Sequence, residues 1–349
     1  MPLPKPRDGE SKDDFISRCM ADNEIRKDFE DNSQRAAVCN SLWEQKDKKA
    51  MSDLHNPECF ADHMGPWMIQ PTVLSNALNL IKAGKMPIKT HNMEGIIAQT
   101  RDHVDEDKIF TLTHNGIAII PIVGTIAKSF GKFNDASSVF IRMQLRAALK
   151  DDDVKGIMLE VTSPGGTVAG TDELANDVAL AANQKPLRAH IQDLGASAAI
   201  WIVSQATIIT ANKMARIGSI GTMMVLEDTS GAAELAGIKV HAITTGIHKA
   251  AGVEGVPITE EQIGSIQDMV NEIQGHFVEA VATGRGMEIS EVEALADGDV
   301  MMANKALEVG LIDGITTFEA ALHDLGEVLA SKHAKEKTQR SKNILDLNS

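Results

Sequence analysis

The hydrophobic positions in the middle of this chain change their spacing in a regular way. Short runs that contain Ile, Leu or Val, at residues 116–123, 154–162 and 185–194, predict buried strands. Between them, at residues 137–150 and 171–183, apolar residues recur at three- and four-residue intervals, which predicts amphipathic helices. Strands that alternate with helices predict an α/β fold with a largely parallel sheet and crossover connections.

Further elements follow from turn and capping signals. The Asn115-Gly116 pair lies between two β-rich runs and predicts a hairpin. Residues 206–212 and 237–245 are rich in Ile, Val and Thr and predict two more strands. A long helix is expected after Thr259, because a capping-box sequence there precedes a continuous apolar stripe.

Changes in composition along the chain predict four segments. Residues 1–48 form a small helical module in which charges are nearly balanced, and residues 49–65 form a charged linker. Residues 66–330 carry the α/β pattern and begin with a helix at 71–84. The polar residues 331–349 are expected to be a mobile tail rather than a packed element.

Charge and hydropathy exclude some classes of partner. The formal net charge of -15 argues against nucleic acid as a main partner, because binding to its backbone needs a basic surface. The beginning of the chain has no apolar core of the kind found in a signal peptide. The apolar stretch 116–127 is too short to span a bilayer. We therefore expect a soluble cytoplasmic protein that does not bind membranes.

The cysteines give a weak indication of compartment. There are three of them, Cys19, Cys39 and Cys59, and a low odd number is expected in a reducing compartment. Cys59 lies four residues from each of His55 and His63, a spacing that suggests a metal site. An intervening proline interrupts any helix that would align the three, and no fourth ligand is evident, so we predict no metal.

Three stretches could carry chemistry, and each also has a simpler interpretation. The SPGG sequence at 163–166 could hold an oxyanion with its backbone N–H groups, or be an ordinary strand-to-helix turn. Ser197 stands among small residues at a predicted strand-to-helix junction, where it could be a nucleophile or only an N-cap. Lys249 precedes small residues and could be a base if desolvation favours its neutral form, or a solvated loop lysine.

Histidines are the alternative bases. His248 is adjacent to Lys249, while His190 and His241 lie within predicted strands. In a regular strand His248 and Lys249 would point to opposite faces, so both cannot serve one site unless the backbone turns. Chain order alone does not choose between them.

Five stretches together resemble the signal peptide peptidase A family of serine proteases, in the order and spacing of that family. The resemblance covers about residues 115 to 320, and within it lies closest to the capsid-assembly (prohead) proteases of tailed phages. The N-terminal segment also resembles a short module found in phage head and prohead-protease proteins. The five stretches are LEVTSPGGTVAG, DLGASAAIWIVSQA, ARIGSIGTMM, TTGIHKAAG and ALEVGLIDGI.

The resemblance implies a Clp protease/crotonase-like spiral of strand-strand-helix units and a serine-lysine dyad. Ser197 is implied as the nucleophile, Lys249 as the general base, and Ser219 as a residue that orients the lysine. Neutral Lys249 would take the proton of Ser197, which attacks the peptide carbonyl, and water would hydrolyse the acyl-enzyme. This mechanism needs no cofactor and no metal.

The oxyanion donors implied by the resemblance are the backbone N–H groups of Ala198, Gly165 and Gly166. Members of the family assemble as homo-oligomeric rings, and the resemblance allows the lysine to come from a neighbouring subunit. The sequence departs from the family at Ile200-Trp201, where the first position is usually aromatic. That departure concerns the substrate pocket or packing and leaves the dyad unaffected.

The implied function is a serine endopeptidase that processes phage head proteins during capsid assembly. Its substrates would be the scaffold, the portal, capsid proteins or the chain itself, in the host cytoplasm or within the prohead or virion. One alternative is a structural or scaffold-binding minor capsid component with an inactive protease fold. Another is a crotonase-type acyl-CoA enzyme, in which Ser197 and Lys249 would have no paired role.

Overall fold

The computed structural model describes residues 11–22, 35, 36, 39, 67–69, 108–130 and 136–347. The chain divides into two compact units, one of Met1–His63 with Leu80–Met86 and one containing the rest, and each is described by itself. The predicted linker 49–65, with its grouping of two histidines and a cysteine, and the predicted helix 71–84 lie outside the described residues.

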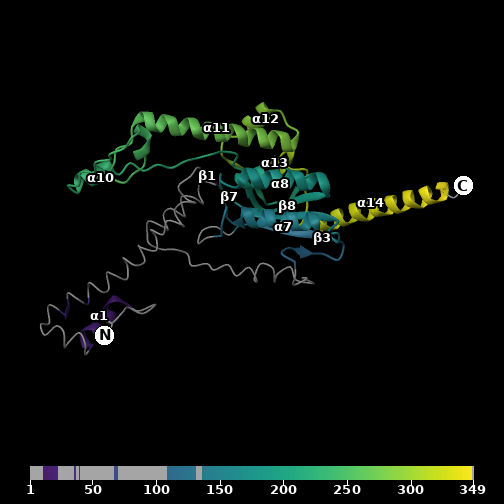
Figure 1. The fold of residues 1–349 in the computed structure, drawn as a ribbon, viewed down its shortest axis with the longest axis horizontal. Helices are drawn as coiled ribbons and strands as arrows, with labels where there is room; N and C mark the ends of the chain where they lie inside the picture. Colours follow the sequence, from purple (N-terminus) through teal and green to yellow (C-terminus); the bar gives the residue numbers. More distant parts are fainter. Residues whose placement is uncertain are drawn as a thin grey trace. The chain divides into compact units, whose positions relative to one another are not determined.

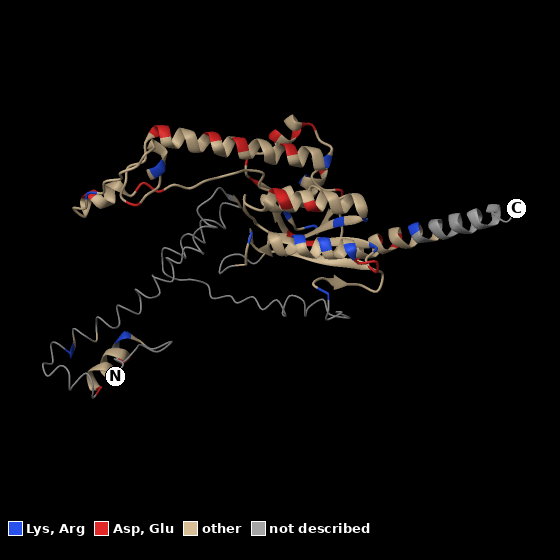
Figure 2. Ribbon diagram, in the orientation of Figure 1, with Lys and Arg blue, Asp and Glu red and all other residues tan. Residues whose placement is uncertain are grey.

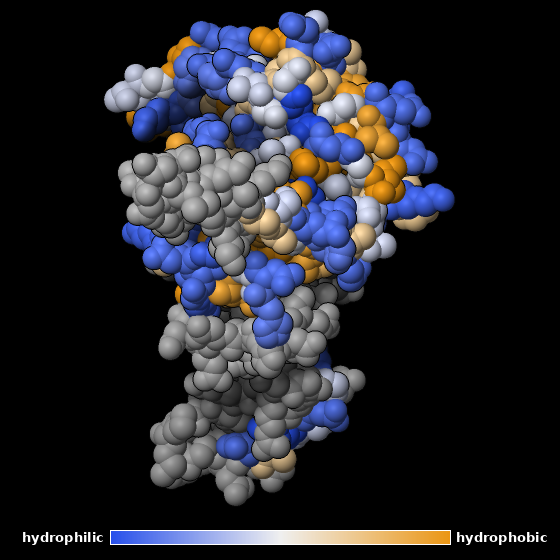
Figure 3. Space-filling view, turned by 90° about the vertical axis from the view of Figure 1, so that its right-hand side faces the viewer, coloured by the Kyte–Doolittle hydropathy of each residue, from blue (hydrophilic) through white to orange (hydrophobic). Residues whose placement is uncertain are grey.

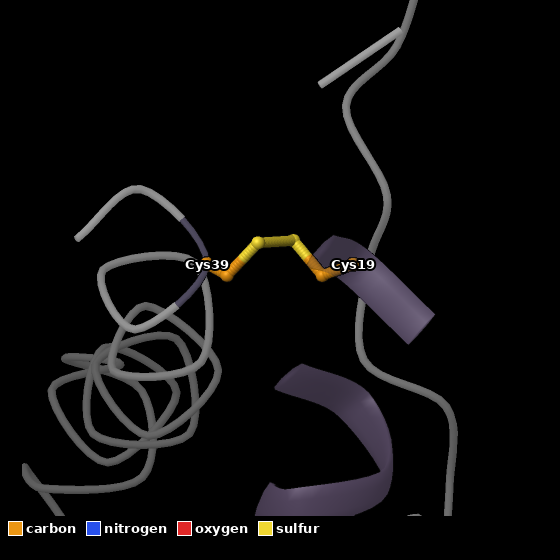
Figure 4. Close-up of a disulfide and its surroundings, with 2 residues drawn as sticks. All are labelled: Cys19 and Cys39. Carbon is orange, nitrogen blue, oxygen red and sulfur yellow. A yellow bond between two sulfur atoms is a disulfide. The ribbon is translucent and has the colours of Figure 1, made fainter. Parts of the chain in front are cut away.

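The first unit contains the helix α1 (Lys12–Ala21) and a disulfide. Ser11 caps the helix by accepting a hydrogen bond from the Asp14 N–H at 3.2 Å. Cys19 and Cys39 are joined by a disulfide with their Cα atoms 5.9 Å apart (Figure 4). The low, odd number of cysteines indicated a reducing compartment, but that number does not show which two cysteines the fold brings together. Because two of the three cysteines form a disulfide, the number of cysteines no longer supports a reducing compartment.

The main sheet of the second unit has eight strands and is mostly parallel. Its hydrogen-bonded order is β11-β10-β8-β6-β3-β2, and β9 joins β8 to β12. Only the β2–β3 and β10–β11 pairs are antiparallel. The α/β class and the hairpin at Asn115-Gly116 are confirmed. The strands are β2 (Thr111–Leu112), β3 (Ile117–Val123), β6 (Gly156–Ser163), β8 (Leu187–Ala196), β9 (Ile208–Ala211), β10 (Arg216–Gly218), β11 (Val300–Met302) and β12 (Gly314–Ile315).

A second, smaller sheet lies beside the carboxyl end of β6. It has the order β1-β7-β4-β5, in which β1 is antiparallel to β7 and the other pairs are parallel. Its strands are β1 (Trp67–Ile69), β4 (Ile126–Ala127), β5 (Ala136–Ser137) and β7 (Gly165–Thr167). Because β7 follows β6 after a single residue, the SPGG sequence forms the junction between the two sheets.

Helices cover both faces of the main sheet (Figure 1). Alternate residues of β6 separate the two layers: Leu159 belongs to the large core with α7, α8 and α9, whereas Met158 packs with Leu325 and Leu329 of α14. This alternation is the period-two pattern expected of a strand buried on both faces. The covering helices are α7 (Ser138–Lys150), α8 (Thr171–Gln184), α9 (Ala198–Val203) and α14 (Phe318–Leu347). Helix α14 continues through the segment predicted to be a mobile polar tail.

Residues 222–259, which we call the arm, connect β10 to the long helix α11 (Glu260–Arg285). The arm contains α10 (Ser230–Leu235) and the short helix η1 (Ile247–Ala250), and Figure 1 shows α10 lying away from the sheet. The strand predicted at 237–245 is wrong. Those residues are not in a strand, and Ile243 is 97% exposed. Their β-branched side chains favour a strand, but a strand needs a pairing partner, which the described residues do not provide.

Helix α11 is packed at one end and largely open at the other. It begins at the predicted capping box, where Thr259 accepts from the Gln262 N–H at 3.3 Å. Near its carboxyl end Phe277 is completely buried and stacks on Trp201, with ring centroids 5.2 Å apart. Ile263, near its amino end, is 45% exposed. The predicted apolar stripe is therefore buried against the core only in its second half. After α11 come α12 (Ile289–Glu293) and α13 (Ala303–Glu308).

The surface is mixed in character rather than uniformly charged. Figure 2 shows Asp and Glu residues at intervals along α11 and Lys and Arg residues along α7. In the view of Figure 3, hydrophobic residues are visible in several separate places between hydrophilic ones. No helix among the residues that the structure describes has the length and apolar character needed to cross a bilayer.

Candidate active site

Ser197 occupies a strained backbone position between β8 and α9. Its φ of 56° and ψ of -121° put a residue with a side chain in a region that is normally left to glycine. Its N–H donates to the Gly218 carbonyl at 2.8 Å, which fixes the turn, and its side chain is completely buried. Such strain persists only where the surrounding structure enforces it, and it is found most often at functional sites.

Ser219 lies beside Ser197 because their strands are neighbours in parallel register. Gly218 of β10 is paired with Ala196 of β8, so the next residue of each strand is a serine at the same edge of the sheet. Ser219 is also strained, with a φ of 51°, and its N–H donates to the Asp299 carbonyl at 2.5 Å. Among the described residues, these two serines are the only non-glycine positions with positive φ.

The SPGG turn reaches the same place from β6. A Cβ atom added to Gly165 would stand 2.9 Å from both the Ala196 carbonyl oxygen and the Ala198 nitrogen. The turn therefore lies directly against the two residues that flank Ser197. At Gly166 a Cβ atom would collide with the Ile126 backbone, so both glycines are required by close approach of the chain.

The predicted oxyanion donors differ in their present hydrogen bonding. The Gly165 N–H donates to the Ser163 hydroxyl at 3.2 Å, and that hydroxyl donates to the Gly124 carbonyl at 2.6 Å. Ser163 thus positions the turn, a role not foreseen although the residue opens the SPGG sequence. Ala198 is the first residue of α9, where N–H groups have no acceptor within the helix, so its N–H is the better-placed donor.

The structure does not bring Lys249 to Ser197 within one subunit. Lys249 is exposed in η1, a helix held at the amino end of α11 by a hydrogen bond from the Gln262 side chain to the Ile247 carbonyl. Ser197 precedes α9, which packs against Phe277 of the same helix. The 15 residues of α11 between these two contacts span about 22 Å along its axis.

The histidines are not better placed as bases. His248 and His241 are exposed in the arm. His190 is completely buried on β8, and its ring nitrogens face the Thr210 hydroxyl at 2.9 Å and the Asn212 side-chain oxygen at 3.2 Å. Burial lowers the pKa of His190, while the Asn212 hydrogen bond opposes the shift. With both nitrogens engaged there, its role is structural.

One grouping of potential metal ligands exists among the described residues. His323, Asp324 and Glu327 are exposed on α14, and their ligand atoms lie within 4.8 Å of one another. This helix packs on the opposite face of the sheet from α9, so the grouping is not part of the site around Ser197.

A strained, buried serine at a strand-to-helix junction, against a glycine turn and a helix amino end, is an arrangement that also occurs in serine hydrolases. The comparison with known families agrees: residues 179–332 match the model of Peptidase family S49. This part of the chain is similar to that family, and the mostly parallel main sheet is consistent with a Clp protease-like fold.

Individual relatives are similar over a large part of the chain. A Methanocaldococcus jannaschii protein, provisionally named a protease, is 37% identical over 51% of this chain and 58% of its own length. The head-tail preconnector protein GP5 of Enterobacteria phage P21 is 28% identical over 68% of this chain and 48% of its own. Capsid assembly protease C of Escherichia phage lambda is 27% identical over 63% and 51%. The chain thus spans about half the length of these relatives.

We expect Ser219→Ala to slow peptide cleavage about 100-fold. The variant would lose the residue expected to orient Lys249, but it would keep the nucleophilic oxygen of Ser197. The backbone around Ser197 should stay in place in this variant. The loss of activity should therefore appear in kcat rather than in KM. The measurement is steady-state cleavage of a labelled protein substrate by wild type and variant. An unchanged kcat would exclude Ser219 from the site.

Proposed function

We propose that the protein is a serine endopeptidase in which Ser197 attacks the peptide carbonyl and Lys249 of a neighbouring subunit removes its proton. The observation that carries this proposal is the strained Ser197 junction, which stands directly against the SPGG turn and the amino end of α9. The negative charge on the carbonyl oxygen would then form beside the Ala198 N–H. The protonated lysine returns the proton to the leaving amine, and water hydrolyses the acyl-enzyme.

The need for a second subunit follows from the arm. Within one subunit the base and the nucleophile are held near opposite ends of α11. The arm also carries apolar side chains that the described residues leave open to solvent. An exposed apolar surface of this kind is typical of an interface. These side chains are Val225, Leu235, Ile238, Val240, Ile243, Ile247 and Val253.

Docking of the arm on the next copy of the chain would cover this surface and bring Lys249 to a Ser197. A head-to-tail contact of this type closes into a ring when the rotation between copies permits. The homo-oligomeric ring is therefore part of the proposal. A lysine acts as a base when burial favours its neutral form, and in this proposal Lys249 becomes buried only when the subunits assemble.

The substrates we propose are phage head proteins: the scaffold, the portal, capsid proteins or the chain itself. Support comes from the names of two relatives, a head-tail preconnector protein and a capsid assembly protease. The site of action would be the host cytoplasm, within the prohead or in the virion. The alternative of an inactive structural component predicts no Ser197-dependent cleavage of any head protein.

Co-expression of two inactive variants tests the shared site. Ser197→Ala retains its lysine and Lys249→Ala retains its serine, so a mixed assembly can form complete sites between unlike neighbours. Random mixing at equal amounts should restore about a quarter of wild-type activity, because each site needs one particular pair of neighbours. Differently tagged subunits allow mixed assemblies to be purified before the assay.

The controls are each variant alone and a mixture of Ser197→Ala with the double variant Ser197→Ala/Lys249→Ala, all of which should stay inactive. Mixed assemblies that are as inactive as these controls, prepared from variants whose separate assemblies have wild-type size, would show that the two groups do not act across subunits.

A further inference from the structure

The short strand β1 occupies the edge of the strand that carries the SPGG glycines. Trp67, Met68 and Ile69 pair antiparallel with Thr167, Gly166 and Gly165. The Met68 side chain is completely buried and belongs to the large core. A segment far from β7 in the sequence therefore lies beside the strand that carries the SPGG glycines (Figure 1).

The Met68 carbonyl marks how close β1 comes to the reacting groups. A Cβ atom added to Gly165 would collide with the Met68 carbonyl oxygen, and the same atom would stand 2.9 Å from the Ala198 nitrogen. The carbonyl oxygen is thus within a few ångströms of the N–H proposed to bind the oxyanion. A peptide substrate bound as an extended strand would have to place its own carbonyl here.

No edge of β7 is left for such a substrate among the described residues. On the other side of β7, Ile126 of β4 pairs with Gly166, and its backbone leaves no space even for a Cβ atom. Peptides that bind as an added strand need a free row of backbone groups. In this arrangement the nucleophile is also inaccessible, because Ser197 has no exposed surface.

We infer that Trp67–Ile69 is an intramolecular competitor of substrate, which occupies the peptide-binding edge of β7 and keeps the site latent until β1 is released. The word substrate here rests on the proposed function. The physical claim does not: the edge of β7 binds an extended apolar peptide, and the chain fills that edge with its own segment.

A binding experiment tests this claim without catalysis. The probe is a fluorescent synthetic peptide of residues 64–71, and the proteins are the full chain with Ser197→Ala and the same chain with Met68→Asp added. An aspartate carboxylate cannot be buried in the apolar core without a large cost, so β1 should leave the edge. Fluorescence anisotropy should then show at least about tenfold tighter binding of the peptide, because apparent affinity rises with the fraction of open edges.

Three controls make the comparison specific. Met68→Leu keeps an apolar side chain of similar volume and should bind the peptide as weakly as the parent. Leu325→Ala removes a buried apolar side chain from the opposite face of the sheet and should not open the edge. A peptide with aspartate at the Met68 position should lose at least about tenfold in affinity. If Met68→Asp does not fold, Met68→Ala gives the same comparison with a smaller increase.

The outcome separates this inference from the proposed function. Equal affinity of the parent and of a folded Met68 variant for the peptide would overturn the inference, whatever the protein cleaves. Labelling of Ser197 by a fluorophosphonate, measured without the Ser197→Ala change, reports the nucleophile and should be faster in Met68→Asp. Tighter peptide binding with no labelling of either protein would support the occupied edge and count against the peptidase.

Discussion

Replacing Ser197 by alanine should reduce peptide cleavage by at least about 10⁴-fold, since removal of a serine nucleophile leaves only binding and oxyanion stabilisation. The fold should survive. The side-chain oxygen makes one long hydrogen bond, to the Gly221 carbonyl at 3.4 Å, and alanine has the same backbone preferences at a positive φ as serine. The measurement is mass spectrometry of new amino termini after co-expression with phage head proteins, together with thermal melting of the purified variant.

Ser204 provides a matched control for this substitution. It is also a buried serine, at the end of α9, and its hydroxyl donates to the Trp201 carbonyl at 2.7 Å. Ser204→Ala should lower stability by about 1 kcal/mol and leave cleavage near the wild-type rate. A Ser197→Ala protein that cleaves as fast as Ser204→Ala would show that the serine hydrolase mechanism is wrong.

Replacing Lys249 by arginine should abolish cleavage almost as completely as Lys249→Ala, with a loss of at least about 10³-fold. Arginine keeps the positive charge and much of the length, but it does not release its proton in the accessible pH range, so it cannot act as a base. If Lys249 contributed only its positive charge or a contact at an interface, Lys249→Arg would keep most of the activity. The measurement is single-turnover cleavage by assembled protein, so that defects of assembly and of chemistry are separated.

Two neighbouring residues provide the comparison. Lys239→Arg makes the same change at another exposed lysine of the arm and should have little effect. His248→Ala should retain most of the activity, with an altered KM at most. A pH profile alone cannot separate the two bases, because a desolvated lysine can titrate in the range of histidine. An active Lys249→Arg with an inactive His248→Ala would assign the base to the histidine.

The sequence predicts those parts of the fold that depend on local patterns. The hairpin at Asn115-Gly116 and the junction at Ser197 follow from turn residues and apolar runs within a few positions of each other. Ser219 was placed in the site by resemblance alone, yet the parallel pairing of β8 and β10 explains its position physically. A periodic pattern read along one strand does not show which strand will be its neighbour.

The features that the sequence does not predict are those that depend on contacts with residues far away in the chain. The apolar residues 237–245 indicate a strand, but β propensity acts only when another strand is present to pair with. The position of β1 is decided by its pairing with β7, far away in the sequence, and η1, which carries Lys249, is held by Gln262 of α11. The Cys19–Cys39 disulfide is likewise not predictable from the sequence. Composition alone does not show whether two cysteines 20 positions apart are bonded to each other.

The separation of Lys249 from Ser197 along α11 has a kinetic consequence. When two copies of a chain complete one reaction centre, the rate of turnover at low occupancy rises with the square of the chain concentration rather than in proportion to it. If the site is shared between subunits as proposed, dilute copies would be silent, and copies confined together inside a closed shell would become active without any chemical signal. Crowding of the enzyme with its targets would set the moment of cleavage, and release of the contents by dilution would end it.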